Sequence, residues 1–174
     1  MATGYLLDTN VLRYWFDDGR PEHDAVTRRI ASLPEASPLA ISAITLGEVE
    51  YGHRALGSYG DPAEEAQFND FISSRLPTVL NVGKHTRGPY GLLRALLFER
   101  FAPKDRRKKG LRPEELLDPT SGKELGIQEN DLWIAAQALE LNLVLVTNDK
   151  MQRLREVGTE LRIESWATPT RTAR

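Results

Sequence analysis

Short apolar runs alternate with longer amphipathic segments along this chain. The apolar runs predict strands at Tyr5–Leu7 and at residues 38–42, 78–82, 143–146 and 162–166. The segments between them predict helices at residues 11–16, 22–33, 43–56, 62–76, 88–101 and 129–142. Strands that alternate with helices indicate an α/β fold, with a parallel sheet of four or five strands covered by helices.

Two regions fall outside this alternation. Residues 111–126 are rich in turn signals and predict an irregular insertion. A length of 174 residues suits one compact domain. We therefore predict one domain over residues 1–166, with an insertion near residues 103–126 and a disordered basic tail at residues 167–174.

The composition excludes several classes of protein. The chain has no cysteine, so disulfides and thiolate metal sites are impossible. No apolar stretch approaches the roughly 18 residues that a membrane span needs, and the first residues lack the pattern of a secretory signal. A net charge of −2 does not fit a protein that coats nucleic acid non-specifically. We expect a cytoplasmic protein without a membrane partner.

Four acidic residues fall where the predicted strands end, and parallel sheets bind ligands at that edge. Asp8 follows the first strand, and Asp149 follows the strand at residues 143–146. Glu48 lies in the second turn of a helix, and helical side chains lean back toward the helix N-terminus. Asp131 lies in the first turn of its helix, where the helix dipole is expected to keep a carboxylate ionised.

Each acid also has an ordinary structural explanation. Asp8, Asp131 and Asp149 can each serve as a helix cap, and Glu48 can be a solvated helix residue. Two neighbouring acids that we expect to be solvated are Glu50 and Glu129. As a group the four are harder to explain, because two carboxylates about 5 Å apart repel by roughly 3 kcal/mol at an effective dielectric constant of 20. Only Lys150, beside Asp149, is placed in the sequence to neutralise one of them.

A hard divalent cation resolves such a repulsion. Mg²⁺ and Mn²⁺ prefer oxygen ligands, whereas the absence of cysteine and the positions of the three histidines argue against zinc. Asn10 and Thr147 lie at the same edge and are predicted to orient the carboxylates, with a turn residue and an ordinary strand residue as the alternatives. We expect Asn130 to cap its helix.

Four segments in this order resemble the PIN-domain ribonucleases, most closely the VapC toxins of bacterial toxin–antitoxin pairs. The segments are LLDTNVL, AITLGEVEYG, ENDLWIAAQAL and LVLVTND, and together they span most of the chain. The resemblance implies a three-layer PIN-like domain. It also implies that the acidic metal site and the catalytic residues are Asp8, Glu48, Asp131 and Asp149, with Thr147 matching the hydroxyl residue that often precedes the last aspartate.

The resemblance further implies an activity and partners. A VapC-type protein is expected to be a Mg²⁺- or Mn²⁺-dependent endoribonuclease that leaves a 5′-phosphate and a 3′-hydroxyl on its RNA products. It is also expected to form a homodimer and to be inhibited by a small antitoxin whose C-terminal segment occupies the active-site cleft. The helix with Leu12, Trp15 and Phe16 has enough apolar area to bind such a segment, or all three simply fill the core.

Several alternatives stay open. A phosphatase or phosphotransferase with an aspartate nucleophile can use a similar sheet, and the fold can also serve as a non-catalytic RNA-binding module. Residues 111–125 interrupt the usual VapC pattern, which leaves substrate specificity open. The basic segment before them either grips RNA phosphates or is a solvated loop. Its candidate RNA-binding residues are Lys104, Arg106, Arg107, Lys108 and Lys109.

Overall fold

A single parallel sheet forms the centre of the molecule. The computed structural model describes residues 3–56, 62–75, 78–103 and 110–167. The strands lie in the order β3–β2–β1–β4–β5, and every pair is parallel. Their bounds are β1 (Tyr5–Leu7), β2 (Leu39–Ser42), β3 (Thr78–Leu80), β4 (Val144–Val146) and β5 (Arg162–Glu164). The predicted α/β fold with a parallel sheet is thereby confirmed, with five strands.

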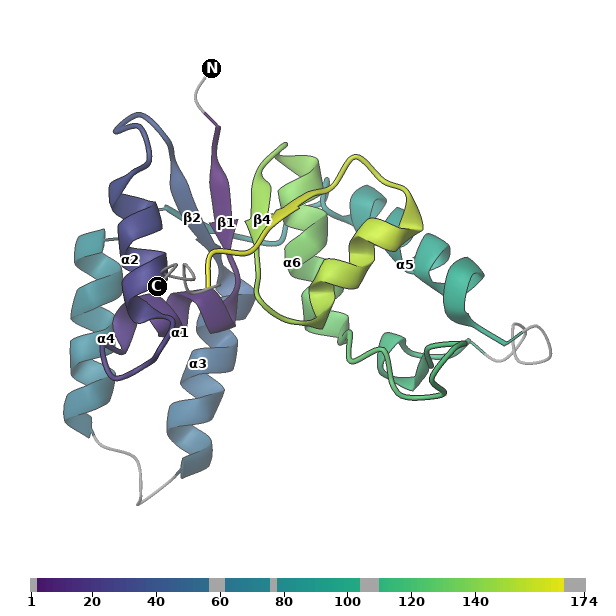
Figure 1. Ribbon diagram of the computed structural model, residues 1–174, viewed down its shortest axis with the longest axis horizontal. Helices are drawn as coiled ribbons and strands as arrows, with labels where there is room; N and C mark the ends of the chain where they lie inside the picture. The colour runs from purple at the N-terminus through teal and green to yellow at the C-terminus, as the bar shows by residue number, and fades with distance from the viewer. Residues whose placement is uncertain (1–2, 57–61, 76–77, 104–109, 168–174) are drawn as a thin grey trace, which may run out of the picture.

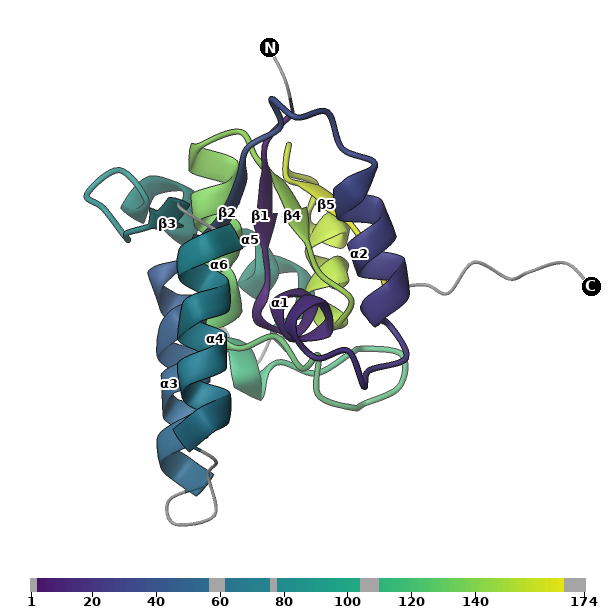
Figure 2. The same ribbon diagram turned by 90° about the vertical axis from the view of Figure 1, so that its left-hand side faces the viewer.

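Helices cover both faces of this sheet and make three layers (Figure 1). One side carries α1 (Thr9–Phe16), α2 (His23–Ala31), α3 (Ala43–Leu56) and α4 (Pro62–Arg75). The other side carries α5 (Arg87–Phe101), α6 (Glu129–Glu140) and the 3₁₀ helix η4 (Lys150–Val157). Figure 2 shows the strands side by side, with α1 across the lower end of β1.

Alternation along the strands divides the core into two clusters. Leu6 of β1 packs in the cluster formed with α5, α6 and η4. Tyr5 and Leu7 pack on the opposite face, with α1, α2 and α4. All three side chains are buried, because the parallel sheet is covered on both faces.

Five predicted boundaries differ from the observed ones by two residues, and several others differ by one. Two of the five are helix ends, because α2 ends at Ala31 instead of residue 33 and α6 ends at Glu140 instead of residue 142. The first helix begins at Thr9 instead of residue 11, because the Asp8 side chain accepts a hydrogen bond from the backbone N–H of Thr9 and caps it. The third and fifth strands end earlier than predicted, at Leu80 and Glu164. Both strands are shorter than predicted, because only three residues in each strand form backbone pairs with the neighbouring strand.

The apolar face of α1 belongs to the core. Leu12 is fully buried, and Trp15 is only 8% exposed, with its ring edge-to-face against Phe71 of α4. The hypothesis that both form a partner-binding surface is therefore wrong, because both side chains are already buried within the chain. Phe16 is half-buried and packs edge-to-face on Phe68.

The insertion folds back on itself between α5 and α6. It contains the helical turn η3 (Pro113–Glu115) and one antiparallel bridge between Leu117 and Glu124. Asp118 holds the turn, because its carboxylate accepts hydrogen bonds from the backbone N–H groups of Thr120 and Ser121 and pairs with the Arg153 guanidinium of η4. Residues at both ends of the insertion, Leu116 and Leu125, are fully buried in the core.

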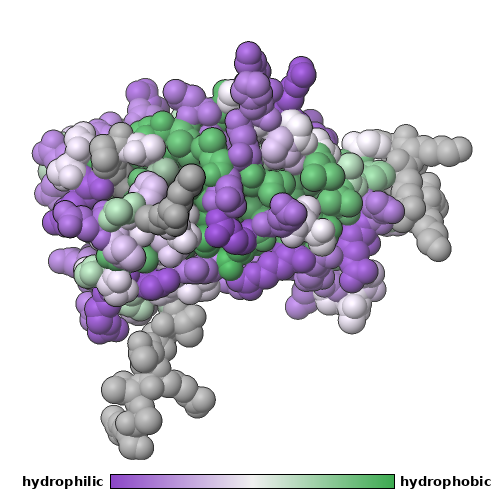
Figure 3. All heavy atoms as spheres, turned by 90° about the horizontal axis from the view of Figure 1, so that it is seen from above, coloured by the Kyte–Doolittle hydropathy of each residue, from purple (hydrophilic) through white to green (hydrophobic). Residues whose placement is uncertain are grey.

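The two ends of the sheet present different surfaces. Seen from above, at the N-terminal ends of the strands, hydrophobic residues form a band crossed by hydrophilic ones (Figure 3). At that end Leu141, which follows α6, is 47% exposed. The carboxyl ends of the strands lie at the opposite end of the molecule, where the predicted acids are found. Among the described residues, no helix is long and apolar enough to cross a membrane.

Candidate active site

An open pocket of about 270 Å³ lies at the carboxyl ends of the central strands. All four predicted acids line it, from the ends of β1 and β4 and from α3 and α6. The lining residues are Asp8, Thr9, Asn10, Arg13, Glu48, Gly126, Gln128, Asp131 and Asp149. The parallel sheet therefore brings together acids that lie up to 141 positions apart in the sequence, which is the distance from Asp8 to Asp149.

Two short polar side chains hold Asp8 and Asp149 together. The Asn10 amide nitrogen donates to an oxygen of Asp8 at 2.7 Å and to an oxygen of Asp149 at 2.8 Å. The Thr147 hydroxyl lies 3.0 Å from both carboxylates. Asn10 and Thr147 thus occupy the orienting positions that the sequence predicts for them.

Glu48 is held from two other elements. One of its oxygens accepts a hydrogen bond from the Thr9 hydroxyl of α1, and the other accepts one from the Asn130 amide at 3.0 Å. The prediction that Asn130 caps α6 is wrong. The residue before the helix is Gln128, whose backbone N–H donates to the Asp131 carboxylate at 2.7 Å, so Asn130 already lies within the first turn and its side chain is free to reach α3.

Burial makes two of the acids difficult to ionise. Burial and, after it, the negative charge of Asp149 together raise the pKa of Asp8 to about 7, although the hydrogen bonds from Thr9 and Thr147 lower it. Burial also raises the pKa of Asp131 to about 7, although the N–H of Gln128 lowers it. The expectation that the helix dipole keeps Asp131 ionised is therefore wrong, because desolvation and the other three acids outweigh it.

The donor atoms of this pocket suit a hard cation by their chemistry. Four carboxylates supply only oxygen ligands, and two of them are strongly destabilised as bare anions. Among the described residues, no three acidic or histidine side chains are grouped tightly enough to enclose a metal ion in the present conformation. The residues therefore fit Mg²⁺ or Mn²⁺ by donor type, and ligation by three of them requires the acids to move closer together.

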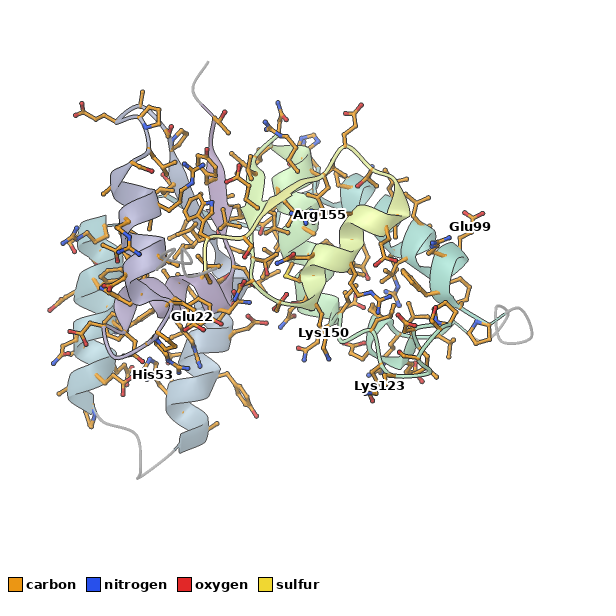
Figure 4. All side chains as sticks on the ribbon, viewed as in Figure 1. Glu22, His53, Glu99, Lys123, Lys150 and Arg155 are labelled. Carbon is orange, nitrogen blue, oxygen red and sulfur yellow. The ribbon has the colours of Figure 1, made fainter. Side chains whose placement is uncertain are left out.

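The neighbouring charged residues are engaged elsewhere. Within the described residues Lys150 forms no ion pair with Asp149. Its side chain lies instead against Gly126, where a Cβ atom would come within 2.7 Å of the ammonium nitrogen. Figure 4 shows Lys150 on the same lower side of the molecule as Lys123 of the insertion. Glu50 pairs with Arg54 on its own helix at 2.6 Å, away from the pocket.

Glu129 is half-exposed, as the sequence suggests, but it is also hydrogen-bonded. It accepts hydrogen bonds from the Tyr90 hydroxyl and from the Arg94 guanidinium of α5. Tyr90 in turn stacks on Trp133 with ring centroids 3.8 Å apart. Glu129 therefore fastens the first turn of α6, which carries Asp131, to α5.

Sequence reasoning missed one lining residue of note, Arg13. It follows Thr9 by four positions and Asn10 by three, so the helical repeat places all three on one face of α1. This helical spacing could have placed Arg13 beside the site from the sequence alone. The candidate RNA-binding residues Lys104, Arg106, Arg107, Lys108 and Lys109 lie outside the described residues.

Comparison with known proteins agrees with this architecture. The PIN domain family model matches residues 5–86, which include Asp8 and Glu48. No curated protein matches the sequence. Among solved structures, VapBC2 from Rickettsia felis bound to a DNA fragment from its promoter has 25% identity and a TM-score of 0.66, with coverage of 94% of this chain and 99% of that chain.

Two further structures are similar over nearly their whole length. DNA-bound VapBC from Salmonella typhimurium has 26% identity and a TM-score of 0.63, covering 94% of this chain and 98% of that one. VapBC-1 from nontypeable Haemophilus influenzae has 24% identity and a TM-score of 0.66, covering 95% of this chain and 100% of that one. The five-stranded sheet has the PIN-like fold, and the similarity to the PIN domain family model covers residues 5–86. These three solved structures, to which the chain is similar, are all VapBC proteins.

Proposed function

We propose that this protein is a Mg²⁺- or Mn²⁺-dependent endoribonuclease and the toxin of a VapBC-like toxin–antitoxin pair. One observation carries the proposal: four carboxylates from four different elements line one open pocket at the carboxyl edge of a PIN-type sheet. Such a pocket repels RNA unless cations neutralise it, and it is wide open to a polymer. The residues that would hold the cation are Asp8, Glu48, Asp131 and Asp149.

The side chains around the acids have defined tasks in this proposal. Asn10 and Thr147 keep Asp8 and Asp149 turned toward each other, and the Thr9 hydroxyl turns Glu48 toward the same pocket. The N–H of Gln128 fixes one oxygen of Asp131. When bound, Mg²⁺ or Mn²⁺ would activate a water for in-line attack and offset the charge that builds up on the phosphate.

Cleavage of a labelled RNA by the purified protein tests the proposal. With Mn²⁺, we expect products with a 5′-phosphate and a 3′-hydroxyl, and no cleavage in EDTA. Asp131→Asn and Asp149→Asn should each lower the cleavage rate by roughly 10²–10³, the scale expected when one group that stabilises transition-state charge is lost. Both variants should also weaken Mn²⁺ binding in calorimetry.

Glu50→Gln is the matched control for these variants. Glu50 lies on the same helix as Glu48, but it pairs with Arg54 and does not line the pocket. We expect this variant to cleave RNA and to bind Mn²⁺ like the wild type. Full activity of Asp131→Asn at saturating Mn²⁺ would remove Asp131 from the site.

A phosphatase with an aspartate nucleophile is the second candidate function, and the hydrogen bonds of Asp8 are compatible with both. One Asp8 oxygen accepts from the backbone N–H of Thr9 at 2.7 Å, and the other accepts from Asn10 and Thr147. A carboxylate has about four acceptor sites, so the oxygen bonded to Thr9 can still contact a cation or attack a phosphorus atom. Trapping of a phosphorylated Asp8 would favour the phosphatase, and RNA binding without cleavage in Mn²⁺ would favour a non-catalytic module.

The proposal includes a cytoplasmic homodimer and a small antitoxin partner. Because Leu12 and Trp15 fill the core, only the half-buried Phe16 of these three apolar side chains is left to contact an antitoxin. Co-expression with the neighbouring small reading frame should relieve toxicity and yield a co-purifying complex. Light scattering of the free protein should give twice the mass of 19.6 kDa.

A further inference from the structure

Arg13 lies at the junction of two hollows in the surface. It lines the carboxylate pocket together with Thr9 and Asn10 of the same helix. It also lines an adjoining hollow of about 280 Å³, which we call the α1–α3 groove. The groove is lined by Arg13, Phe16, Asp17, Arg20, Val49, Gly52, His53, Glu64 and Phe68.

Successive turns of α1 meet successive turns of α3 at this junction. Thr9 contacts Glu48 through a hydrogen bond, and Arg13, four residues later, lies against Gly52, also four residues later. The contact between Arg13 and Gly52 therefore lies one helical turn, about 5.4 Å, from the contact between Thr9 and Glu48. Figure 4 shows His53, the next residue of α3, beside α1 and facing α4.

Gly52 makes room for the Arg13 side chain. A Cβ atom at position 52 would lie 2.9 Å from a terminal nitrogen of the Arg13 guanidinium, which is closer than such atoms approach. Because Gly52 has no side chain, the Arg13 guanidinium lies directly on the surface of α3. In this position Arg13 lines both the carboxylate pocket and the α1–α3 groove.

The guanidinium has no carboxylate partner among the described residues. Two other arginines nearby are paired: Arg20 with Asp17 at 3.0 Å, and Arg54 with Glu50 at 2.6 Å. Arg13 is exposed and is the only cationic side chain among the described residues that line the carboxylate pocket. Its five N–H donors are available for a ligand with several oxygen atoms.

We propose that Arg13 binds a backbone phosphate of the RNA next to the scissile one, and that Gly52 positions its guanidinium for this task. The inference rests on the proposed ribonuclease function and adds a substrate-binding residue to it. A guanidinium binds two phosphate oxygens at once, in a geometry that lysine does not offer. Its offset of one turn from the acids lets it hold the chain without displacing the cation that the acids need.

RNA binding by an inactive variant separates this role from catalysis. In the Glu48→Gln background with Mn²⁺, Arg13→Gln should weaken the affinity for a labelled RNA about 5–20-fold and reduce the slope of log K against log salt by about one. Arg20→Gln is the matched control. Arg20 lines the same groove, but it is paired with Asp17 and does not line the carboxylate pocket, so its loss should change affinity less than twofold.

Gly52→Ala tests the positioning without removing the charge. The added methyl displaces only the end of a flexible side chain, and alanine favours the helix over glycine by about 1 kcal/mol, so the variant should fold at least as well as the wild type. With the active enzyme, both Gly52→Ala and Arg13→Gln should raise KM for RNA several-fold with a smaller change in kcat. Arg13→Lys should recover only part of the affinity.

A different outcome would overturn the assignment. If Arg13 only neutralises the acids, Arg13→Gln will tighten Mn²⁺ binding in calorimetry while RNA affinity and the salt slope stay unchanged. An unchanged KM in Gly52→Ala would remove Gly52 from the inference. Failure of the wild type itself to bind or cleave RNA would instead remove the ribonuclease proposal, and this assignment with it.

Discussion

Asp8 caps a helix and also lines the carboxylate pocket. Its side chain caps α1 through the N–H of Thr9, and the same carboxylate faces Asp149 across the Asn10 amide. The cap fixes where α1 begins. This start of the helix places the Asn10 amide within hydrogen-bonding distance of both Asp8 and Asp149. The sequence offered a cap and a site residue as explanations of Asp8; the cap is confirmed by its contacts, and the same side chain also lines the carboxylate pocket.

The raised pKa values predict how the stability of the metal-free protein depends on pH. The pKa values of Asp8 and Asp131 are both about 7 in the folded state and 3.8 in the unfolded reference. Between these values the folded state binds more protons than the unfolded state, so the free energy of unfolding falls as pH rises. We expect urea unfolding in EDTA to show a loss of a few kcal/mol from pH 4.5 to pH 7.5.

Two variants separate this effect from other titrating groups. Asp131→Asn should remove part of the fall and make the metal-free protein more stable at pH 7.5, because one buried charge is gone. Glu50→Gln, outside the pocket, should leave the pH dependence unchanged. A profile in Asp131→Asn as steep as in the wild type would show that Asp131 does not titrate in this range.

At the scale of single residues, the sequence could indicate which acids meet but not their charge state. Asp8 and Asp149 stand directly after strands, and the parallel sheet dictates that such positions share an edge. The pKa of Asp131 depends on burial against residues distant in the sequence, so the local rule about helix N-termini gave the wrong answer. The same holds for Asn130, whose partner Glu48 is 82 positions away.

The insertion contains one helical turn and one antiparallel bridge, and a small set of further contacts holds it. Asp118 accepts two backbone N–H groups within the turn and pairs with Arg153. The backbone N–H of Ser121 and the Arg153 guanidinium, in that order, lower the pKa of Asp118 to about 2. Glu114, at the start of the insertion, accepts the N–H of Glu129 at 2.9 Å and so supports the first turn of α6.

Removal of the Asp118 charge should loosen the insertion without unfolding the domain. In Asp118→Asn the turn loses its ion pair with Arg153, and we expect faster amide exchange at residues 118–124 with little change in exchange at β1. Glu156→Gln is the control, because Glu156 is the other partner of Arg153. Equal effects in the two variants would show that the turn is held by other contacts, such as the burial of Leu116 and Leu125.

The sequence predicted the number and type of the helices and strands better than it predicted where each one begins and ends. Helical and strand periodicities differ enough to place all five strands, and a cap such as Asp8 then moves a boundary by two residues. The path of residues 111–126 was not predictable, because it depends on the Asp118–Arg153 pair and on the close packing of Lys150 over Gly126. Gly126 has a φ of +70°, a left-handed conformation that suits glycine at that crossing.

At the scale of the whole molecule, the parallel sheet gathers four acids at the carboxyl ends of its strands. Two hydrophobic clusters, one on each face, supply the stability that four gathered acids oppose. The four carboxylates of the pocket therefore repel one another in the ligand-free protein. A ligand that neutralises them is expected to raise the free energy of unfolding. This links metal binding to stability independently of any activity.

Divalent cations should raise the melting temperature, and the rise should depend on pH. A ligand that binds only the folded state at 100 times its dissociation constant contributes about 2.7 kcal/mol. Binding displaces the protons held by Asp8 and Asp131, so we expect a larger rise with Mn²⁺ at pH 8 than at pH 5.5. Asp149→Asn should lose most of the rise, whereas Glu50→Gln should keep it. A rise of equal size in Asp149→Asn would place the bound cation somewhere other than the carboxylate pocket.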